Sequence, residues 1–257
     1  MTFEVPVELY DRHVGRYAEP LAAALMGVAG IESHQRVLDV GCGPGGLTEA
    51  LARRVGAERV SAVDPSQSFV AACTTRVPGA DVHLGRAEEL PFADGSFDAV
   101  LSQLVVNFMS DAEAGVREMR RVTRIDRVVV SCVWDYAAGM TMLRAFWDAA
   151  LELDPAAPDE AATMPYCTPG ALRALWESCG LEEVETGDLV VEADYAGFDD
   201  FWSPFPTGLG PSGAYCASLG PEAQDALRAA CFRRLGEPAG PFRLPARAWF
   251  VRGRAYY

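Results

Sequence analysis

The segment RVLDVGCGPGG, residues 36–46, constrains the fold of this chain more than any other. A short apolar run leads directly into the spacing G-x-G-x-x-G, formed by Gly41, Gly43 and Gly46, and a helical stretch follows. A strand, a tight turn and a helix in this order place backbone N–H groups at a helix N-terminus, where a phosphate or a carboxylate can bind. The glycine spacing alone does not decide which ligand the turn holds.

From residue 36 to residue 134, short β-branched runs alternate with stretches whose apolar residues recur at helical spacing. We expect strands at 36–40, 59–64, 81–84, 97–102 and 127–134, with helices between most of them. This alternation predicts an α/β fold with a Rossmann-like, doubly wound sheet. In such a sheet the ligand crevice lies at the carboxyl ends of the central strands.

The sequence outside residues 36–134 predicts further elements of the same domain and two insertions. We expect a helix that begins at Thr168 and ends at Gly180, a strand at about 181–193, a helix at 221–235 and a last strand at 246–255. Residues 1–257 are therefore expected to form a single domain, in which 1–30 are an N-terminal helical cover and 36–134 are the cofactor-binding core. The segments 135–166 and 194–240 are interpreted as helical cap insertions that fold over the crevice.

Charge and cysteine content exclude several functions. The chain has 22 basic and 36 acidic residues, a net charge of −14, which opposes binding to nucleic acid or to an anionic membrane. The start lacks the pattern of a secretory signal, and no 18-residue apolar run occurs, so we expect a soluble, cytoplasmic protein. Seven scattered cysteines without C-x-x-C spacing predict reduced thiols rather than disulfides or zinc. The oligomeric state stays open.

Two acids beside the glycine turn narrow the choice of ligand. Asp39 lies two residues before Gly41, where it adds nothing to pyrophosphate binding but suits a ligand with an ammonium group. Asp64 ends the second expected strand and is placed for a ribose diol, although it could instead cap the helix that starts near Pro65. Together these features favour a nucleoside ligand that also has an amino group.

Four successive segments resemble the motifs of a known family. They are VLDVGCGPGGLT, AVDPSQSFV, GRAEELPFADGSFDAVLSQLVVNFMSD, and EMRRVTR followed by VVVSCVWD. They are similar to class I S-adenosylmethionine-dependent methyltransferases, in the small-molecule branch of the ubiquinone/menaquinone-biosynthesis type, the methyltransferase type 11 domain. The resemblance covers about residues 8–135. It implies a seven-stranded sheet whose last strand is antiparallel, which agrees with the expected strand at 246–255.

The resemblance implies a binding site for S-adenosyl-L-methionine. Asp39 would face the ammonium group, Asp64 the ribose hydroxyls and Gln103 the sulfonium. Arg16, Tyr10 or Tyr17 would meet the methionine carboxylate, which a guanidinium can bind with two hydrogen bonds. The residues assigned to this cofactor site are Tyr10, Arg16, Asp39, Gly41, Gly43, Asp64, Pro65, Ala87, Glu88 and Gln103, with Ala87 and Glu88 flanking the adenine.

Three positions depart from the family pattern. Arg86 stands where an acid often binds the adenine amino group, and Asn107 stands where histidine is frequent. The sequence TRIDRV, residues 123–128, replaces a proline-glycine turn before the fifth expected strand. Because that turn would lie opposite the crevice, we expect it to affect packing rather than chemistry.

The resemblance implies an enzyme that transfers a methyl group by in-line displacement. Such a reaction needs alignment and exclusion of water, and it needs a general base only if the accepting atom holds a proton of high pKa. The candidates for a base are His13, Asp135 and Tyr136. No cluster of acids suggests magnesium, so we expect no metal.

The aromatic residues of the two insertions predict a small, largely hydrophobic acceptor, methylated on oxygen, nitrogen or carbon. The residues assigned to its site are Tyr136, Phe146, Trp147, Trp202 and Tyr215; the alternative is that these side chains form the core of the cap. Two other functions stay open. One is an NAD(P)-dependent oxidoreductase, although the chain has no lysine and hence no Tyr-x-x-x-Lys pair. The other is a binding protein of this fold without transfer activity.

Overall fold

A computed structural model of the protein describes residues 12–256. Seven strands form one sheet in the order β3-β2-β1-β4-β5-β7-β6. β1 through β5 pair in parallel, whereas β7 runs antiparallel to both β5 and β6. The expected doubly wound sheet with an antiparallel last strand is confirmed. The strands are β1 (Val37–Val40), β2 (Val60–Asp64), β3 (Asp81–Leu84), β4 (Phe97–Gln103), β5 (Thr123–Trp134), β6 (Leu181–Tyr195) and β7 (Phe242–Ala255).

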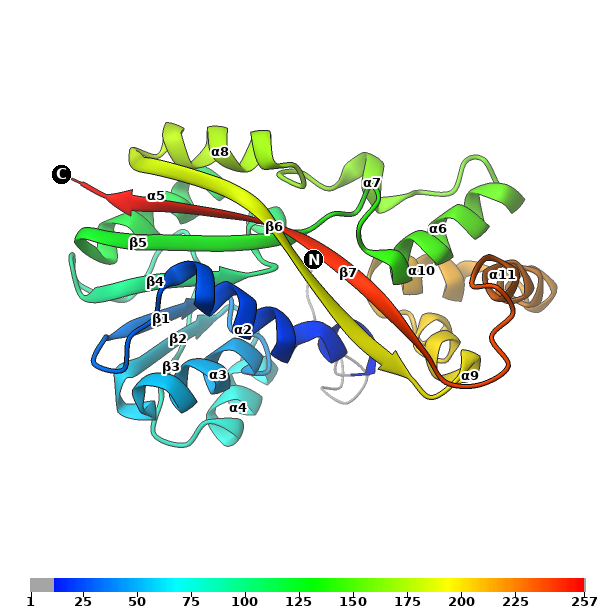
Figure 1. The fold of residues 1–257 in the computed structure, drawn as a ribbon, viewed down its shortest axis with the longest axis horizontal. Coiled ribbons are helices and arrows are strands. Elements are labelled where there is room, and N and C mark those ends of the chain that lie inside the picture. Colours follow the sequence, from blue (N-terminus) through cyan, green and yellow to red (C-terminus); the bar gives the residue numbers. More distant parts are fainter. Residues whose placement is uncertain (1–11, 257) are drawn as a thin grey trace.

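Helices cover both faces of the sheet (Figure 1). One face has α2 (Ala18–Ala29), α3 (Gly46–Val55) and α4 (Gln67–Arg76), and the other has α5 (Ala112–Val122) and α8 (Pro169–Ser178). The central strands β1 and β2 are buried along their whole length, as apolar parallel strands between two helical layers must be. Each face consequently has its own apolar core.

A second group of helices lies beyond the sheet, around the far end of the long β6–β7 ribbon (Figure 1). We call these helices the cap: α6 (Thr141–Leu153), α7 (Glu160–Thr163), α9 (Phe198–Trp202), α10 (Gly210–Ser218) and α11 (Pro221–Arg234), with the 3-10 turn η4 (Phe205–Thr207). The apolar core on the α2 face continues without interruption into the cap. The chain therefore joins sheet and cap through one shared core.

Local signals explain where several elements begin and end. The 3-10 turn η1 (Val14–Tyr17) precedes α2, and Pro20 falls in the first turn of α2, where its missing N–H breaks no helical hydrogen bond. The hydroxyl of Thr168 accepts a hydrogen bond from the Ala171 N–H and caps α8, and Gly180 follows at a φ of 77°. The start and end expected for this helix are confirmed.

The fifth strand is longer than the sequence suggested. Its first residue is Thr123 instead of 127, because the TRIDRV segment joins the sheet as a bulge. The register shifts opposite Phe97 and Ala99, and Asp126 takes a left-handed φ of 61°. The bulge lies at the opposite end of β5 from Trp134, so it affects packing far from the glycine turn.

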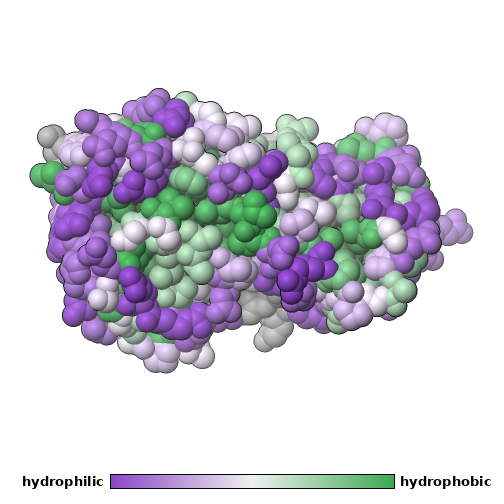
Figure 2. All heavy atoms as spheres, viewed as in Figure 1, coloured by the Kyte–Doolittle hydropathy of each residue, from purple (hydrophilic) through white to green (hydrophobic). Residues whose placement is uncertain are grey.

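The surface is mostly polar, with one exception on the face that Figure 2 shows. Apolar residues gather in a band over the middle of this face, across β6 and α2. Val190 of β6 contributes to the exposed apolar surface, with 60% of its area accessible. Within residues 12–256, no helix combines the length and the apolar character that a membrane crossing needs.

Candidate cofactor and acceptor site

The glycine turn adopts a conformation that side chains disfavour. Gly41, Gly43 and Gly45 all have positive φ values, of 75°, 52° and 95°. The Gly41 N–H donates to the Val63 carbonyl at 2.8 Å and ties the turn to β2. A β-carbon on Gly41 would lie 2.5 Å from a methyl group of Val105. Glycine is thus required at position 41 for both its backbone angle and the space around it.

Asp39 lies beneath this turn as a buried carboxyl group with one unused oxygen. Its side chain is 1% exposed, and Oδ2 accepts a 2.7 Å hydrogen bond from the Thr48 hydroxyl. Oδ1 is buried and has no partner among residues 12–256. Burial raises the pKa of Asp39 to about 7 against the effect of the Thr48 hydrogen bond, and the nearby Asp64 charge raises it further.

Asp64 closes the turn from β2. Its Oδ2 accepts from the Gly43 N–H at 2.9 Å, and its Oδ1 accepts from the Ser66 N–H at 2.8 Å. Burial raises the pKa of Asp64, although these two N–H groups act in the opposite direction. The cap of α4 is Ser66, whose hydroxyl accepts from the Phe69 N–H. Each oxygen of Asp64 keeps acceptor capacity that two ribose hydroxyls can use.

Gln103 ends β4, the strand beside β1. Its Nε2 donates to the Ala18 carbonyl at 3.2 Å and so attaches the start of α2 to the sheet. Its Oε1 is buried and unpaired among the described residues. The next residue, Leu104, has a left-handed φ of 64°, which is strained for a side chain and common at functional sites. Two unsatisfied acceptor oxygens, from Asp39 and Gln103, therefore lie on neighbouring strands.

The residues assigned to the adenine have other contacts. Ala87 is buried against α5, and Pro65 is exposed after β2. Oε1 of Glu88 accepts hydrogen bonds from the N–H groups of Ser110 and Asp111, at 2.9 and 3.3 Å. Arg86 donates to the Ser110 hydroxyl at 2.6 Å. Arg86 and Glu88 thus hold the loop before α5, and the part of Ala87 and Glu88 in adenine binding stays a prediction.

The N-terminal segment is attached to β6 and α9. Arg16 forms an ion pair with Asp200 in which both N–O distances are 3.2 Å, and its guanidinium lies 4.1 Å from the centre of the Tyr195 ring. The hydroxyl groups of Tyr17 and Tyr195 lie 3.1 Å apart. Binding of a methionine carboxylate by Arg16 would have to replace the Asp200 contact and stays a prediction. Tyr10 lies outside the described residues.

Two of the three candidate bases are buried in specific contacts. His13 is 4% exposed, and its ring meets Phe205 edge-on at 5.0 Å. Burial, and then the Arg16 charge, lower the pKa of His13 to about 4. Oδ2 of Asp135 accepts two hydrogen bonds from Arg247, at 2.9 and 2.6 Å, and Oδ1 accepts from the Ala138 N–H. Both carboxylate oxygens of Asp135 are therefore engaged in hydrogen bonds.

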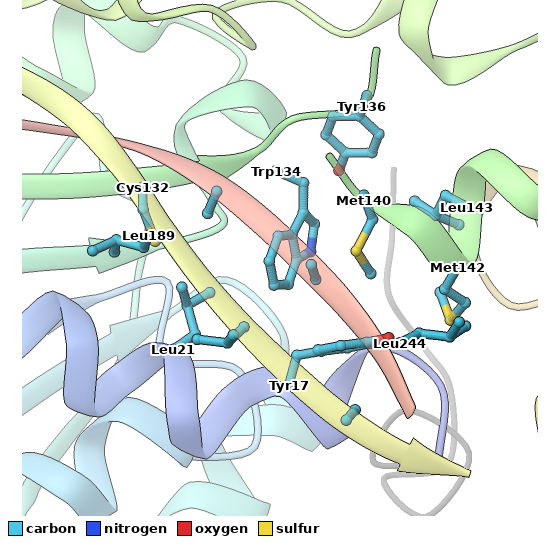
Figure 3. Packing of buried hydrophobic residues seen from close by; sticks show 14 of the residues in the cluster. Tyr17, Leu21, Cys132, Trp134, Tyr136, Met140, Met142, Leu143, Leu189 and Leu244 are labelled. Carbon is cyan, nitrogen blue, oxygen red and sulfur yellow. The ribbon is translucent and has the colours of Figure 1, made fainter. Parts of the chain in front are cut away.

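The third candidate, Tyr136, belongs to the apolar core where the sheet meets the cap. It is 5% exposed. Figure 3 shows its ring above Trp134 and Met140, with the hydroxyl end directed toward them. Tyr17 approaches the same cluster from below, and its ring meets Trp134 edge-on at 5.8 Å. The region between sheet and cap is consequently closed by aromatic and methionine side chains.

The aromatic residues assigned to the acceptor lie together. Phe146 and Trp147 are fully buried on α6, and Phe146 stacks on Phe205 at 4.5 Å. Trp147 lies 5.6 Å from Tyr215, and Trp202 lies 5.8 Å from Phe205. Such pairs stabilise a core beyond the area they bury. Phe146 and Trp147 thus form the core of the cap, which is the alternative that the sequence left open.

Two buried polar residues of the site were not predicted from the sequence to bind a ligand. Glu160 of α7 is 4% exposed, and its Oε2 accepts a 2.7 Å hydrogen bond from Trp147 Nε1. Asn107 lies in the 3-10 turn η3 (Val106–Phe108) directly after β4 and is 6% exposed. The Oδ1 of Asn107 is buried without a partner among residues 12–256. The sequence around Glu160 is rich in proline and alanine, and no local pattern indicated that the carboxyl group would be buried.

The comparisons with known proteins agree with this geometry. Residues 38–130 match the model of a family described as a methyltransferase domain. This segment includes β1, the glycine turn, Asp64 and Gln103. This part of the chain is therefore similar to a methyltransferase domain. No group of three or more side chains arranged to bind a metal occurs in the described part of the chain.

Two curated relatives illustrate the similarity. Malonyl-[acyl-carrier protein] O-methyltransferase of Erwinia pyrifoliae is 41% identical over 90 residues, which are 35% of this chain and 33% of that protein. Demethylmenaquinone methyltransferase of Beutenbergia cavernae is 42% identical over 101 residues, 39% of this chain and 41% of that protein. The matched segments thus span less than half the length of these relatives.

Solved structures share the whole architecture. YcgJ of Bacillus subtilis has a TM-score of 0.58 and 19% identity, over 92% of this chain and 98% of its own. Phosphoethanolamine N-methyltransferase 2 of Haemonchus contortus, solved with S-adenosylhomocysteine, has a TM-score of 0.57 and 16% identity, over 96% of this chain and 59% of its own. At these identities the likeness shows the fold, which is that of class I methyltransferases.

Proposed function

We propose that the protein transfers the methyl group of S-adenosylmethionine to a small, largely hydrophobic acceptor. The unpaired Oδ1 of Asp39, buried beneath the glycine turn, supports this proposal most directly. A buried acceptor without a donor costs free energy unless a ligand satisfies it, and the ammonium group of the cofactor is such a donor. The residues present therefore fit the cofactor.

The chain would hold this cofactor through four features. Asp39 pairs with its ammonium group, and Asp64 accepts from its ribose hydroxyls. The turn at Gly41 and Gly43 lets the ligand approach the backbone, and Gln103 Oε1 offers a further acceptor. Bound there, the cofactor supplies an electrophilic methyl group on a sulfonium. The protein contributes alignment and the exclusion of water, which the closed cluster around Trp134 supports.

The acceptor class is inferred from the cap and the charge. The curated relatives are named for malonyl-[acyl-carrier protein] and demethylmenaquinone, but their matches cover only 35% and 39% of this chain. The family model ends at residue 130, before the cap begins. The cap of this chain is rich in aromatic residues, and the net charge of −14 disfavours phosphorylated acceptors and nucleic acid. The free state of all seven cysteines suits the reducing cytoplasm, which we propose as the location.

Calorimetry with S-adenosylhomocysteine and with NADH tests the cofactor. We expect the first to bind and the second not to bind, because the matches are to methyltransferases. Asp64→Ala should weaken S-adenosylhomocysteine binding by about 1–3 kcal/mol, the cost of stranded hydrogen-bonding groups. Asp225→Ala, on the exposed face of α11, is the matched control and should change nothing. The assignment would be refuted if NADH bound tightly and Asp64→Ala left the affinity for S-adenosylhomocysteine unchanged.

Turnover tests the transfer itself. Labelled methyl groups should move from S-adenosylmethionine to members of a panel of apolar metabolites, with and without EDTA. We propose that the reaction is independent of metal, so EDTA should leave the rate unchanged. Binding of S-adenosylhomocysteine without transfer to any member would favour a binding protein of this fold instead.

A further inference from the structure

A buried acid in the cap has no role in the proposed cofactor site. Glu160 begins the single turn α7, and the loop before it is exposed at Asp154, Pro155 and Pro158. Its Oε2 is held by Trp147 Nε1 at 2.7 Å, whereas no residue in 12–256 donates a hydrogen bond to Oε1. Burial raises the pKa of Glu160 to about 7, and the Trp147 hydrogen bond limits this rise.

The position of α7 connects this acid to the methyl-transfer region. The Met164 N–H donates to the Glu160 carbonyl at 2.9 Å, so both residues belong to one turn. The Met164 sulfur lies 3.7 Å from Asn107 Nδ2, in the turn that directly follows β4 and Gln103. Figure 1 shows α7 between α6 and α8. The contact between Met164 and Asn107 brings the end of this turn close to the segment that follows β4.

Two side-chain oxygens of this region accept no hydrogen bond from residues 12–256. Asn107 presents its amide nitrogen to the Met164 sulfur and leaves Oδ1 buried and unpaired within the described chain. Glu160 has an unused Oε1. A ligand that satisfies both must donate hydrogen bonds, and at neutral pH it must tolerate a carboxylate.

Within residues 12–256, no cationic side chain forms an ion pair with Glu160. The charged and titratable groups near Glu160 are Asp159, Arg144, Asp135 and Cys167. Arg144 is bound to Asp159 by two 2.9 Å contacts and also to Asp148. Asp135 is bound to Arg247, and burial raises the pKa of the Cys167 thiol to about 12, so it stays neutral. The Glu160 carboxylate therefore has no ion pair of its own within residues 12–256, although the charge of Arg144 lowers its pKa.

We propose that Glu160 and Asn107 bind the amino group of the acceptor, so that the acceptor is an apolar amine and the methylated atom is nitrogen. This inference rests on the proposed function. An ammonium group has enough protons for both oxygens, whereas an alcohol has one and a carboxylate has none and is repelled. The negative net charge of the chain favours the same class of ligand.

The geometry also provides the proton transfer that nitrogen methylation requires. The bound ammonium gives one proton to the Glu160 carboxylate and becomes a neutral amine. Its lone pair then forms the nitrogen–carbon bond, while the carbon–sulfur bond of the sulfonium breaks and its electron pair stays on sulfur. The products are a methylated ammonium, S-adenosylhomocysteine and a protonated Glu160, so atoms and charge balance.

Binding measurements on the protein saturated with S-adenosylhomocysteine test this proposal without turnover. The probes are 2-phenylethylamine and octylamine, each compared with the alcohol of the same skeleton and with 3-phenylpropanoate. We expect the amines to bind at least tenfold more tightly than the alcohols, and Glu160→Gln to abolish that preference. Glu222→Gln, on the exposed start of α11, is the control and should leave it intact. A preference for alcohols or carboxylate, equal binding, or an amine preference that survives Glu160→Gln would overturn the proposal.

Two further readouts separate this role from a structural one. Amine affinity of the wild-type protein should rise as the pH increases through about 7, where Glu160 ionises, and it should be flat in Glu160→Gln. Asn107→Leu should weaken the binding of the amines three- to tenfold. This variant tests the proposal if Glu160→Gln does not fold. All variants should bind S-adenosylhomocysteine like the wild type. If the wild-type protein did not bind S-adenosylhomocysteine, the proposed function would be refuted. If it bound S-adenosylhomocysteine but showed no amine preference that depends on Glu160, only this inference would be refuted.

Discussion

The cofactor half and the cap of this molecule differ in how completely their buried polar groups are hydrogen-bonded. Around the glycine turn, Asp39 Oδ1 and Gln103 Oε1 are buried and unpaired within the described chain. In the cap, Arg144 pairs with Asp159, and Trp147 donates to Glu160. Unsatisfied buried groups lower stability, and they remain in native proteins mainly where a ligand completes them. The cofactor half therefore offers a ligand two buried, unpaired oxygens, whereas in the cap Glu160 has one oxygen held by Trp147 and the other without a donor among residues 12–256.

The two halves also differ in how far apart in the sequence their contacting residues lie. In the cofactor half, the glycine turn and its two acids all lie within residues 36–64, and the bond from Gly43 to Asp64 spans 21 positions. The bond between Arg247 and Asp135 that holds the start of the cap spans 112 positions. A local motif reveals the first kind of contact, whereas the second exists only once the whole fold has formed.

The largest expected effect is on the aromatic core of the cap. Phe205 is fully buried and contacts Phe146, Phe201 and Trp202, so Phe205→Ala should lower the free energy of unfolding by about 3–5 kcal/mol. Urea unfolding gives this value. If the halves are separate in function, affinity for S-adenosylhomocysteine at 10 °C should stay within twofold of the wild type. Phe205→Leu is the conservative control. If affinity for S-adenosylhomocysteine fell in proportion to stability in both variants, the two halves would not be separate in function.

The second test compares two arginines of one strand. Arg247→Ala leaves the buried Asp135 carboxylate without its partner and should cost about 3 kcal/mol of stability. Arg243 of the same strand pairs with Asp194 and Glu192 at the surface, where solvent screens the charges, so Arg243→Ala should cost much less stability than Arg247→Ala. Chemical unfolding of both variants measures the difference. Equal costs would show that Asp135 is not held in the way the structure indicates.

The contrast explains what the sequence revealed and what it did not. The glycine spacing, Asp39 and Asp64 lie on consecutive elements, so their order predicted the turn and the parallel strands. The cofactor was predicted from the resemblance of four successive motifs to a known family. The burial of Phe146 against Phe205 depends on packing between insertions, and helical spacing could not separate a core from an acceptor wall. Glu160 was missed because its burial comes from Trp147, and nothing in the intervening sequence indicates that contact.

The third prediction concerns the unpaired acid of the cofactor half. Because burial raises the pKa of Asp39 to about 7, the folded protein holds this proton more tightly than the unfolded chain does. Ionisation therefore costs stability as the pH rises from about 4 to about 7, and the full cost is present above that range. Asp39→Asn should remove this cost, so the ligand-free variant should be more stable than the wild type at pH 8.

The same substitution should impair the ligand site. Asp39→Asn should weaken S-adenosylhomocysteine binding at pH 8 by about 1.5–3 kcal/mol, the contribution of a hydrogen bond to a charged group. Wild-type affinity should rise between pH 6 and pH 8 as Asp39 ionises, and the variant should lose this rise. Calorimetry across that range measures both. A variant that is less stable at pH 8 and unchanged in affinity would contradict the role of Asp39 as a ligand-binding acid.

The smallest effect should come from Thr48, whose hydroxyl is the donor to Asp39 Oδ2 at 2.7 Å. This hydrogen bond lowers the pKa of Asp39 against the effect of burial, so Thr48→Val should raise that pKa further. Fewer molecules then have the carboxylate at pH 7, and S-adenosylhomocysteine affinity should fall by about 0.5–1 kcal/mol, part of the value of one hydrogen bond. The rise of affinity with pH should move to higher pH, and wild type and variant should converge near pH 9. Thr48→Ser keeps the hydroxyl and should behave like the wild type. A loss that is the same at every pH would instead mean that Thr48 supports the glycine turn by packing, not through the ionisation of Asp39.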